Sequence, residues 1–183
     1  MNSENLTPEN EDAIGPVVIK AKEHLPVNGI LVPYAAALFG STLLGLVLGH
    51  IRPITAGIPS SQVIKNCYIG FGFVFILVGL LLSSRALSDS NIKQKVLQGK
   101  LVTDGVYAWC RHPLYSGFLF ISAGVLFISG NAFCYIIPII GYFVIQHYVK
   151  NTEEQWLLNM FPDDYPAYQE KVNCLFPFPP KKK

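Results

Sequence analysis

A polar stretch between two apolar regions holds the side chains of this chain that are best suited to chemistry. It covers residues 99–115, and the side chains that stand out in it are Tyr107, Trp109, Arg111, His112 and Tyr115. They stand at the start of a segment that is apolar for about the length of a membrane helix. Polar groups at the edge of hydrocarbon cost free energy unless they are bound to a partner, so residues kept there indicate a functional site by default.

The same residues also allow a purely structural interpretation. Pro113 suits the first turn of a helix, where its missing N–H would have no partner. Arg111 and His112 could be interfacial anchors that face lipid headgroups, with Trp109 and the tyrosines forming an aromatic belt. This stretch alone leaves both interpretations open.

The composition is that of an integral membrane protein. Of the 183 residues, 51% are hydrophobic and 14% are charged, and the mean hydropathy is +0.36, whereas soluble domains carry roughly 25% charged residues. The net charge of +2 is too small to indicate a nucleic-acid partner. The four cysteines, Cys67, Cys110, Cys134 and Cys174, lack zinc-site spacing, so we expect no metal. All four are expected to be buried thiols, and Cys67 and Cys134 fall in apolar runs.

Uncharged segments predict an all-α fold with about four transmembrane helices. A bilayer needs about 20 apolar residues per helix, and the segments near this length are 30–49, 66–84, 113–129 and 132–149. Residues 113–149 are too long for one span, so we expect a helical hairpin that turns at Ser129, Gly130 and Asn131. Pro138 is expected to kink its second arm.

Small residues in the first two segments predict close contacts between helices. In the second segment, Gly70 and Gly72 are assigned to helix packing, because no strand precedes them as a nucleotide-binding loop would require. The small residues of the first segment recur at about helical spacing and are Gly40, Ser41, Gly45 and Gly49.

The lysines and arginines predict the orientation in the membrane. With four spans, residues 1–29, the connector 85–112 and the segment 150–178 lie on one side, which holds most basic residues, against Arg52 and Lys65 on the other. The positive-inside rule places the richer side in the cytosol.

Residues 1–29 are then a flexible cytosolic tail, since the first residues are too polar for a cleavable signal peptide. Residues 150–178 are expected to form an amphipathic segment at the membrane surface, interrupted near Pro162.

Residues 105–117 closely resemble the signature of isoprenylcysteine carboxyl methyltransferases. These enzymes belong to a group of small membrane methyltransferases that includes phospholipid N-methyltransferases. In this chain the stretch reads Gly-Val-Tyr-Ala-Trp-Cys-Arg-His-Pro-Leu-Tyr-Ser-Gly. A second match follows at the spacing of the family and comprises Glu153, Glu154, residues 157–161, residues 164–168, Val172, Pro177 and Phe178.

The resemblance implies S-adenosylmethionine as methyl donor, bound without a Rossmann domain, and prenylated protein C-termini as substrates. It also implies an endoplasmic reticulum membrane location, with a site that faces the cytosol. An upstream glutamine of the family pattern corresponds to Gln94 or Gln98. The other positions that match cofactor-binding residues are Gly99, Lys100, Leu101, Val102, Tyr107, His112, Pro113, Leu114, Tyr115 and Glu153.

The chain departs from the family pattern at one important position. The family usually has an arginine four residues before the first glutamate, thought to orient the substrate carboxylate, and Val149 stands there in this chain. The nearest cation is Lys150, which becomes a candidate for that role, with Glu153 as the other candidate catalytic residue. This departure leaves phospholipid N-methylation open as an alternative activity. A third alternative is a non-catalytic membrane scaffold that has kept the fold.

The implied reaction is an in-line displacement that moves a methyl group from a sulfonium to a carboxylate. Because a carboxylate is already ionised near neutral pH, the chemistry needs positioning more than a general base, and alignment of the reacting groups can contribute roughly 7–11 kcal/mol.

The two neighbouring glutamates are expected to have different roles. Glu153 is expected to bind the cofactor together with His112, whereas Glu154 is expected to be a solvated carboxylate in the first turn of a surface helix. Arg111 is expected to pair with a headgroup phosphate and receives no catalytic role. Tyr165 and Tyr168 are expected to pack in a core.

Overall fold

The computed structural model describes residues 31–49, 51, 58–88, 95 and 100–179. Within these residues the protein is helical, apart from loops and one isolated bridge between Cys110 and Asn173. The predicted tail 1–29, Gln94, Gln98 and Gly99 lie outside the described residues. The all-α prediction is confirmed for the part of the chain that the structure describes.

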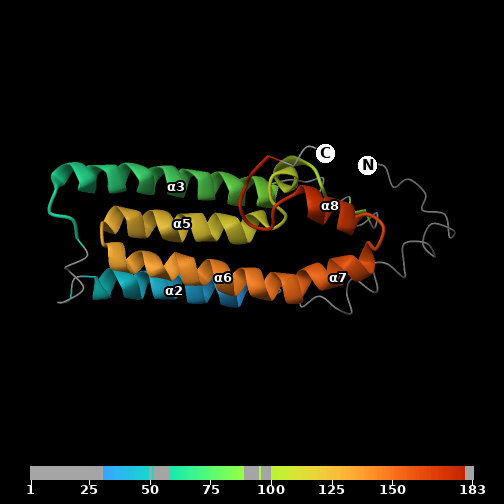
Figure 1. Ribbon diagram of the computed structural model, residues 1–183, viewed down its shortest axis with the longest axis horizontal. Coiled ribbons are helices and arrows are strands. Elements are labelled where there is room, and N and C mark those ends of the chain that lie inside the picture. The colour runs from blue at the N-terminus through green and yellow to red at the C-terminus, as the bar shows by residue number, and fades with distance from the viewer. Residues whose placement is uncertain (1–30, 50, 52–57, 89–94, 96–99, 180–183) are drawn as a thin grey trace, which may run out of the picture.

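Four long helices form the body of the molecule. They are α2 (Leu31–Leu48), α3 (Gln62–Ser88), α5 (Pro113–Ser129) and α6 (Ile136–Asn151), and they lie side by side with alternating direction (Figure 1). The start of α2, the end of α3, the start of α5 and the end of α6 therefore share one end, which we call the site end. The short elements there are η2 (Gly105–Ala108), α7 (Glu153–Met160) and α8 (Tyr165–Lys171), while η3 (Ala132–Tyr135) joins α5 to α6 at the other end.

Three helices are long and apolar enough to cross a membrane. They are Leu31–Leu48, Gln62–Ser88 and Ala132–Met160, and α5 is a shorter apolar helix of 17 residues. At 1.5 Å per residue α5 is about 25 Å long, at the lower limit for a span. It lies against all three other long helices, whereas Leu43, Phe73 and Phe143 on those helices are more than 60% exposed and face the surroundings expected to be lipid.

Glycines bring α3 and α5 into backbone contact. Gly72 and Gly79 on α3 stand seven residues apart, as do Gly117 and Gly124 on the antiparallel α5. A Cβ added at Gly79 would lie 2.6 Å from the carbonyl oxygen of Gly117, and one at Gly124 would lie 2.6 Å from that of Gly72. No side chain fits at these positions, so the glycines fix both the separation and the axial position of the two helices.

The structure confirms the glycine prediction for Gly45, Gly49 and Gly72, which face close neighbours. It contradicts the prediction for Gly40 and Gly70, beside which there is open space. Cys67 is likewise exposed on α3, contrary to the prediction of a buried thiol, while Cys134 is buried. The length of an apolar run does not show which face of a membrane helix meets its neighbours, because lipid-facing positions are as apolar as the core.

The hairpin between α5 and α6 turns where the sequence predicts it. Gly130 takes the left-handed conformation with φ of 70°, and the Asn131 side chain accepts a hydrogen bond from the Phe133 N–H. Pro138, which the sequence predicts to kink the second arm, lies at the start of α6. This proline is the third residue of α6, in a first turn whose N–H groups have no partners within the helix, so it interrupts no hydrogen bond there.

Substitution of Gly79 by alanine should destabilise the protein. The added methyl group meets backbone atoms of α5, which cannot move aside alone, and such overpacking costs about 1–3 kcal/mol. Thermal unfolding of the purified protein in detergent should show a lower Tm. Gly70→Ala is the matched control on the same helix, where open space should allow equal or slightly higher stability because alanine forms helices better. Equal losses in both variants would contradict the close contact.

Candidate active site

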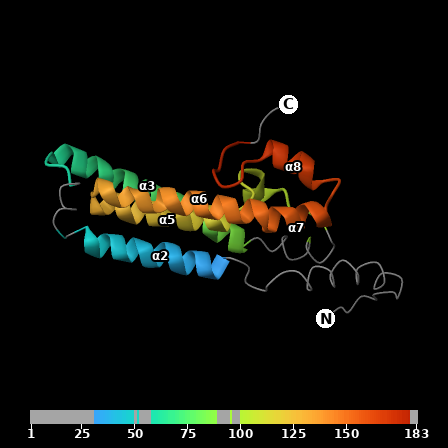
Figure 2. The same ribbon diagram turned by 60° about the horizontal axis from the view of Figure 1, so that its bottom comes forward.

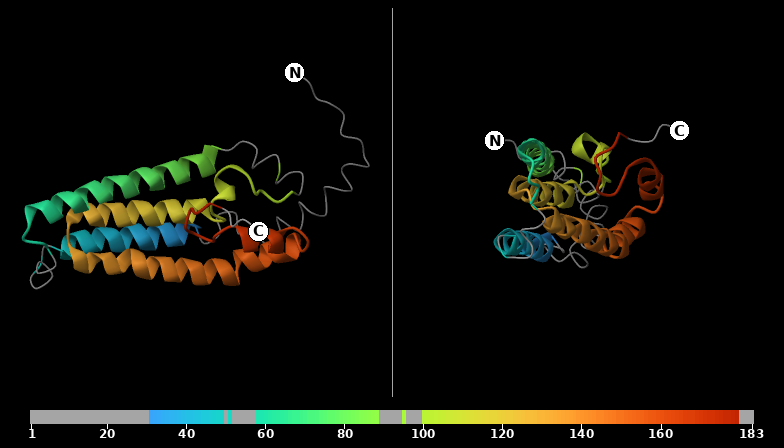
Figure 3. Two further views of the ribbon diagram at one scale, coloured as in Figure 1. Left: turned by 45° about the horizontal axis from the view of Figure 1, so that its top comes forward. Right: turned by 60° about the vertical axis from the view of Figure 1, so that its left-hand side comes forward.

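The polar stretch before α5 is held by the end of the chain. Residues 110–112 run parallel to residues 173–175, with a bridge between Cys110 and Asn173. The N–H of Arg111 donates to the carbonyl of Asn173 at 2.9 Å and the N–H of His112 to that of Cys174 at 3.1 Å. These bonds satisfy backbone N–H and carbonyl groups that lie outside any helix. They also direct the Arg111 and His112 side chains toward α7 and α8. Figures 2 and 3 show α7 continuing beyond α6 and α8 lying beside it.

Arg111 and Glu154 form an ion pair buried at the centre of this junction. The Nε and Nη2 atoms of Arg111 donate to Oε1 of Glu154 at 2.9 and 2.6 Å, and Nη1 donates to the carbonyls of Gln169 and Val172, both at 2.8 Å. Gln169 Nε2 donates to Oε2 of Glu154 at 2.9 Å. The two charged side chains are 6% and 1% exposed. Burial of this pair is therefore matched by hydrogen bonds on both partners.

The structure corrects two expectations at this pair. Glu154 is not solvated, and Arg111 does not reach out toward headgroups; each is bound by the other. The carbonyls of Gln169 and Val172 lie at the end of α8, where a helix leaves acceptors without partners. A guanidinium, with its five donors, satisfies both carbonyls and a carboxylate at once.

His112 lies between the two glutamates. Its Nδ1 is 3.4 Å from Oε2 of Glu153 and its Nε2 is 3.5 Å from Oε1 of Glu154, and the residue is 8% exposed. Burial alone lowers the pKa of His112, but the contacts with Glu153 and Glu154 outweigh it and the net shift is upward. The imidazolium form therefore persists to higher pH than in a free histidine. Nε2 is buried without a hydrogen-bond partner among the described residues.

Glu153 is the more open of the two carboxylates. Its side chain is 25% exposed, and its Oε1 accepts a hydrogen bond from the Tyr115 hydroxyl. Tyr115 is buried, and its ring meets that of Tyr34 of α2 edge-on at 5.6 Å between ring centres. Glu153 and Glu154 are the first residues of α7, where the N-terminal dipole favours carboxylates. The site thus offers one accessible carboxylate beside a buried imidazole.

The structure brings His112, Pro113, Tyr115 and Glu153 together, as the sequence predicts. Pro113 is buried as the first residue of α5, and Leu114 next to it is half-buried. Cys174 is half-buried beside them.

The remaining candidates lie outside this cluster. Leu101 packs against Tyr165, Tyr168 and Val172, and the backbone carbonyl of Tyr107 accepts a hydrogen bond from the Tyr168 hydroxyl at 2.7 Å. The predicted packing role of the two tyrosines is confirmed. Near them, Val102 is half-buried and Lys100 is exposed.

Lys150 and Val149 lie on different sides of α6. Val149 is fully buried in the core cluster that includes Tyr34, Tyr115 and Leu175, whereas Lys150 is exposed. Lys150 therefore does not occupy the place that the Val149 side chain takes, and the structure does not bring it to His112.

Three residues of the site were missed by sequence reasoning. Tyr34, Glu154 and Gln169 come from three different elements, and only Glu154 carried a signal, because it adjoins Glu153 at the start of a helix. Adjacent positions of a helix point about 100° apart, so one glutamate faces Tyr115 while the next faces Arg111. No spacing in the sequence indicated the contact of Gln169 with Glu154.

One cluster in the described part of the chain has the composition of a metal site. Potential ligand atoms of His112, Glu154 and Cys174 lie within 4.8 Å of one another. However, the Arg111 guanidinium already binds Oε1 of Glu154, and burial raises the pKa of the Cys174 thiol to about 12, so this thiol stays protonated. A resident cation and a protonated thiol favour an ion-pair network at this place over a metal ion.

Comparison with known proteins places the chain beside membrane methyltransferases. A sequence model described as phospholipid methyltransferase matches residues 68–164. The chain is 35% identical over 173 residues to protein-S-isoprenylcysteine O-methyltransferase of Saccharomyces cerevisiae, covering 89% of this chain and 70% of that protein. It is 32% identical over 175 residues to protein-S-isoprenylcysteine O-methyltransferase B of Arabidopsis thaliana, covering 88% and 83%.

Animal relatives match over a shorter region. The protein-S-isoprenylcysteine O-methyltransferase of Mus musculus is 32% identical over 116 residues, which cover 58% of this chain and 40% of that protein. The chain therefore matches less than half the length of the mouse protein. No solved structure matches it.

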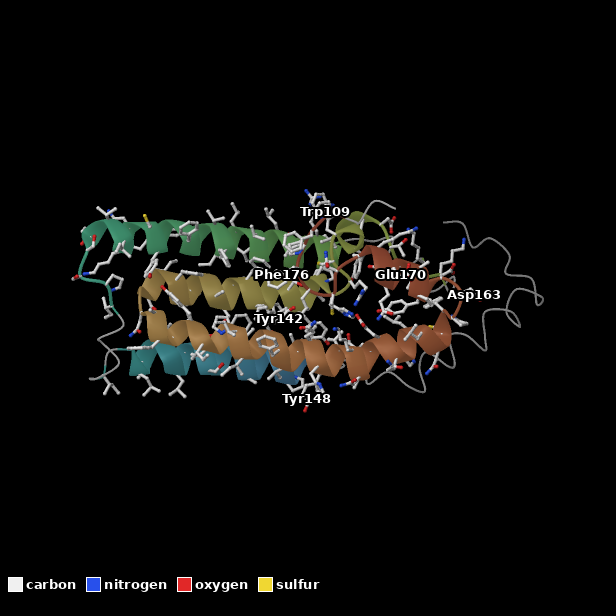
Figure 4. The ribbon with its side chains drawn as sticks, viewed as in Figure 1. Trp109, Tyr142, Tyr148, Asp163, Glu170 and Phe176 are labelled. Atoms are coloured by element: carbon white, nitrogen blue, oxygen red, sulfur yellow. The ribbon has the colours of Figure 1, made fainter. Side chains whose placement is uncertain are left out.

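Removal of the Glu154 carboxylate should destabilise the junction strongly. Glu154→Ala leaves the Arg111 guanidinium buried without its anion, which costs about 3–5 kcal/mol, and Tm in detergent should fall accordingly. Glu170→Ala on exposed α8 surface (Figure 4) is the control and should change stability by less than about 0.5 kcal/mol. In a double-mutant cycle with Arg111→Ala, the double variant should lose less than the sum of the single losses. Additive losses would contradict the coupling.

Proposed function

Because this chain belongs to the phospholipid methyltransferase family, together with its relatives named protein-S-isoprenylcysteine O-methyltransferase, we propose that it methylates the C-terminal carboxylate of a prenylated cysteine. The methyl donor in this proposal is S-adenosylmethionine. The observation that carries it is the meeting of His112, Tyr115 and Glu153 at one end of a bundle of membrane-length helices. We place this end at the cytosolic face of the endoplasmic reticulum membrane.

The residues at the site fit a cationic cofactor that also carries hydrogen-bonding groups. Glu153 has an accessible carboxylate held by Tyr115, and His112 has a buried Nε2 without a hydrogen-bond partner among the described residues. S-adenosylmethionine supplies, when bound, a methyl group on a positively charged sulfur. In our proposal Glu153 and His112 hold this cofactor, and the family resemblance adds residues 99–102, Gln94 and Tyr107 of the connector as further candidate binding positions.

The charges at the site favour transfer to an anion. Arg111 and protonated His112 balance Glu153 and Glu154, so the protein contributes no net charge to the reacting groups. A carboxylate acceptor neutralises the sulfonium in the transition state, and a dry environment strengthens that attraction. The protein then needs to align the acceptor and exclude water, without a general base. Glu153, held in place by Tyr115, performs the alignment on the cofactor side.

A groove in the bundle supports a substrate with a hydrocarbon chain. It has a volume of about 450 Å³ and lies over α5, between α3 and α6, where Phe75, Phe127, Ala123 and Tyr142 are among its walls. Phe176, one residue after the segment that pairs with residues 110–112, closes its near end and packs on Tyr142 at 5.2 Å between ring centres (Figure 4). An isoprenoid in this groove would hold its cysteine near the site.

Phospholipid N-methylation is the second candidate, favoured by the description of the matching family. Its acceptor is an amine, and its lipid substrate would also suit a hydrocarbon groove. The two activities differ in product chemistry, since a methyl ester is base-labile and a methylated amine is base-stable.

The direct test is to incubate the purified protein with S-adenosylmethionine labelled in the methyl group. With a farnesylated cysteine analogue as acceptor we expect a base-labile labelled product. A base-stable product from phosphatidylethanolamine, with none from the cysteine analogue, would replace our proposal by the second candidate. Cofactor binding without any turnover would identify a scaffold.

His112→Ala and Glu153→Ala should each weaken cofactor binding. Loss of a hydrogen bond to a charged group costs about 1.5–3 kcal/mol, which corresponds to about tenfold or more in Kd. Isothermal calorimetry in detergent measures it, with Glu170→Ala on the exposed face of α8 as a control that should bind like the unmodified protein. If both site variants bind with unchanged Kd, the pocket lies elsewhere.

Filling the groove should affect the lipid substrate alone. Ala123 is 8% exposed at the groove wall, so Ala123→Phe places a ring where an isoprenoid would lie. If the ring keeps about two methylene groups of the isoprenoid out of the groove, binding weakens by about 1.6 kcal/mol. KM for the farnesylated substrate should then rise roughly tenfold, while the cofactor Kd stays unchanged. Ala37→Phe on the exposed face of α2 is the control and should leave KM as it is. An unchanged KM in Ala123→Phe would remove the groove from the proposal.

A further inference from the structure

A second hollow lies at the site end, on the face of α3. It has a volume of about 520 Å³ and is bounded by the last turns of α3, by η2 and by Pro177. Trp109, which follows η2, forms part of its wall and is 50% exposed (Figure 4). None of the side chains of the His112, Tyr115 and Glu153 cluster is among its lining residues. This hollow is therefore lined by other residues than the candidate active site.

Along α3, the residues that line this hollow change from apolar to cationic, as a phospholipid changes from its acyl chains to its headgroup. Val78 and Leu81 are apolar, Arg85 follows one turn later, and Ser88 ends the helix. With a rise of 1.5 Å per residue, the Arg85 backbone lies about 10 Å beyond that of Val78, toward the site end. Tryptophan rings prefer the headgroup level of a bilayer, and Trp109 closes the hollow.

The charge of the hollow selects among lipids. Arg85 is the one ionisable side chain among the described residues that line it, so the hollow is cationic. A phosphate is the natural partner of a guanidinium. A zwitterionic headgroup would bring its own ammonium group close to Arg85, whereas an anionic headgroup brings no such repulsion.

We propose that this hollow binds one anionic phospholipid of the bilayer. Arg85 contacts the phosphate, Trp109 covers the glycerol and headgroup level, and an acyl chain runs along Val78 and Leu81. Trp109 directly precedes residues 110–112, which are paired with residues 173–175. A lipid at this place therefore braces the segment that holds Arg111 and His112. The proposal rests on membrane insertion of α3 and is independent of methyl transfer.

Trp109 can report its own lipid neighbour. The chain has two tryptophans, so Trp156→Phe leaves Trp109 as the single fluorophore. This variant is reconstituted in phosphatidylcholine nanodiscs that contain a minor fraction of brominated lipid, either phosphatidylglycerol or phosphatidylcholine, because bromine quenches tryptophan on contact. We expect brominated phosphatidylglycerol to quench Trp109 as if enriched roughly fivefold over its mole fraction. Brominated phosphatidylcholine should quench only in proportion to its fraction.

Variants of the same background identify the cation responsible. Arg85→Gln should abolish the excess quenching by phosphatidylglycerol, and Arg85→Lys should retain most of it. Lys171→Gln removes the same charge from an exposed position of α8 outside the hollow and should leave the excess intact. Equal quenching by the two brominated lipids would overturn the proposal. So would an excess that survives in Arg85→Gln or that disappears in Lys171→Gln.

Discussion

The buried ion pair between Arg111 and Glu154 is the interaction on which the rest of the site depends. One guanidinium joins three segments, because it belongs to the stretch before α5 and binds the start of α7 and the end of α8. Leaving any one of these partners buried and unpaired would be costly, so the network forms as a unit. The network also positions the His112 ring, because His112 follows Arg111 directly in the chain.

This pair also explains why two neighbouring glutamates have different environments. Both carboxylate oxygens of Glu154 accept hydrogen bonds, from Arg111 and Gln169, and its side chain is only 1% exposed. Glu153, one position earlier, turns toward Tyr115 and remains partly open. Because Glu154 anchors the first turn of α7, the accessible carboxylate of Glu153 beside it is held in a fixed place. His112, between the two, screens their mutual repulsion.

The sequence predicted the elements well and the tertiary contacts poorly, for a physical reason. Apolar runs with charges at their ends define membrane helices, so α2 and α5 match the expected ranges within two residues, and Gly130 marks the turn. The same apolarity does not distinguish core from lipid, which is why Cys67 was misplaced. The sequence indicates surface charges at Arg111 and Glu154, because these two partners stand 43 positions apart in the chain. Only the fold reveals that pairing.

Packing inside the hydrocarbon fixes geometry outside it. The glycines of α3 and α5 let backbone meet backbone, so α5 cannot slide along α3 without a collision. A shift of one residue would move His112 and Tyr115 by about 1.5 Å, more than the roughly 0.5 Å that a binding site tolerates. The site residues stand at the first turn of α5, a few residues before Gly117. The contacts between α3 and α5 therefore fix the position of Tyr115. The polar network then holds α7, and with it Glu153, against α5.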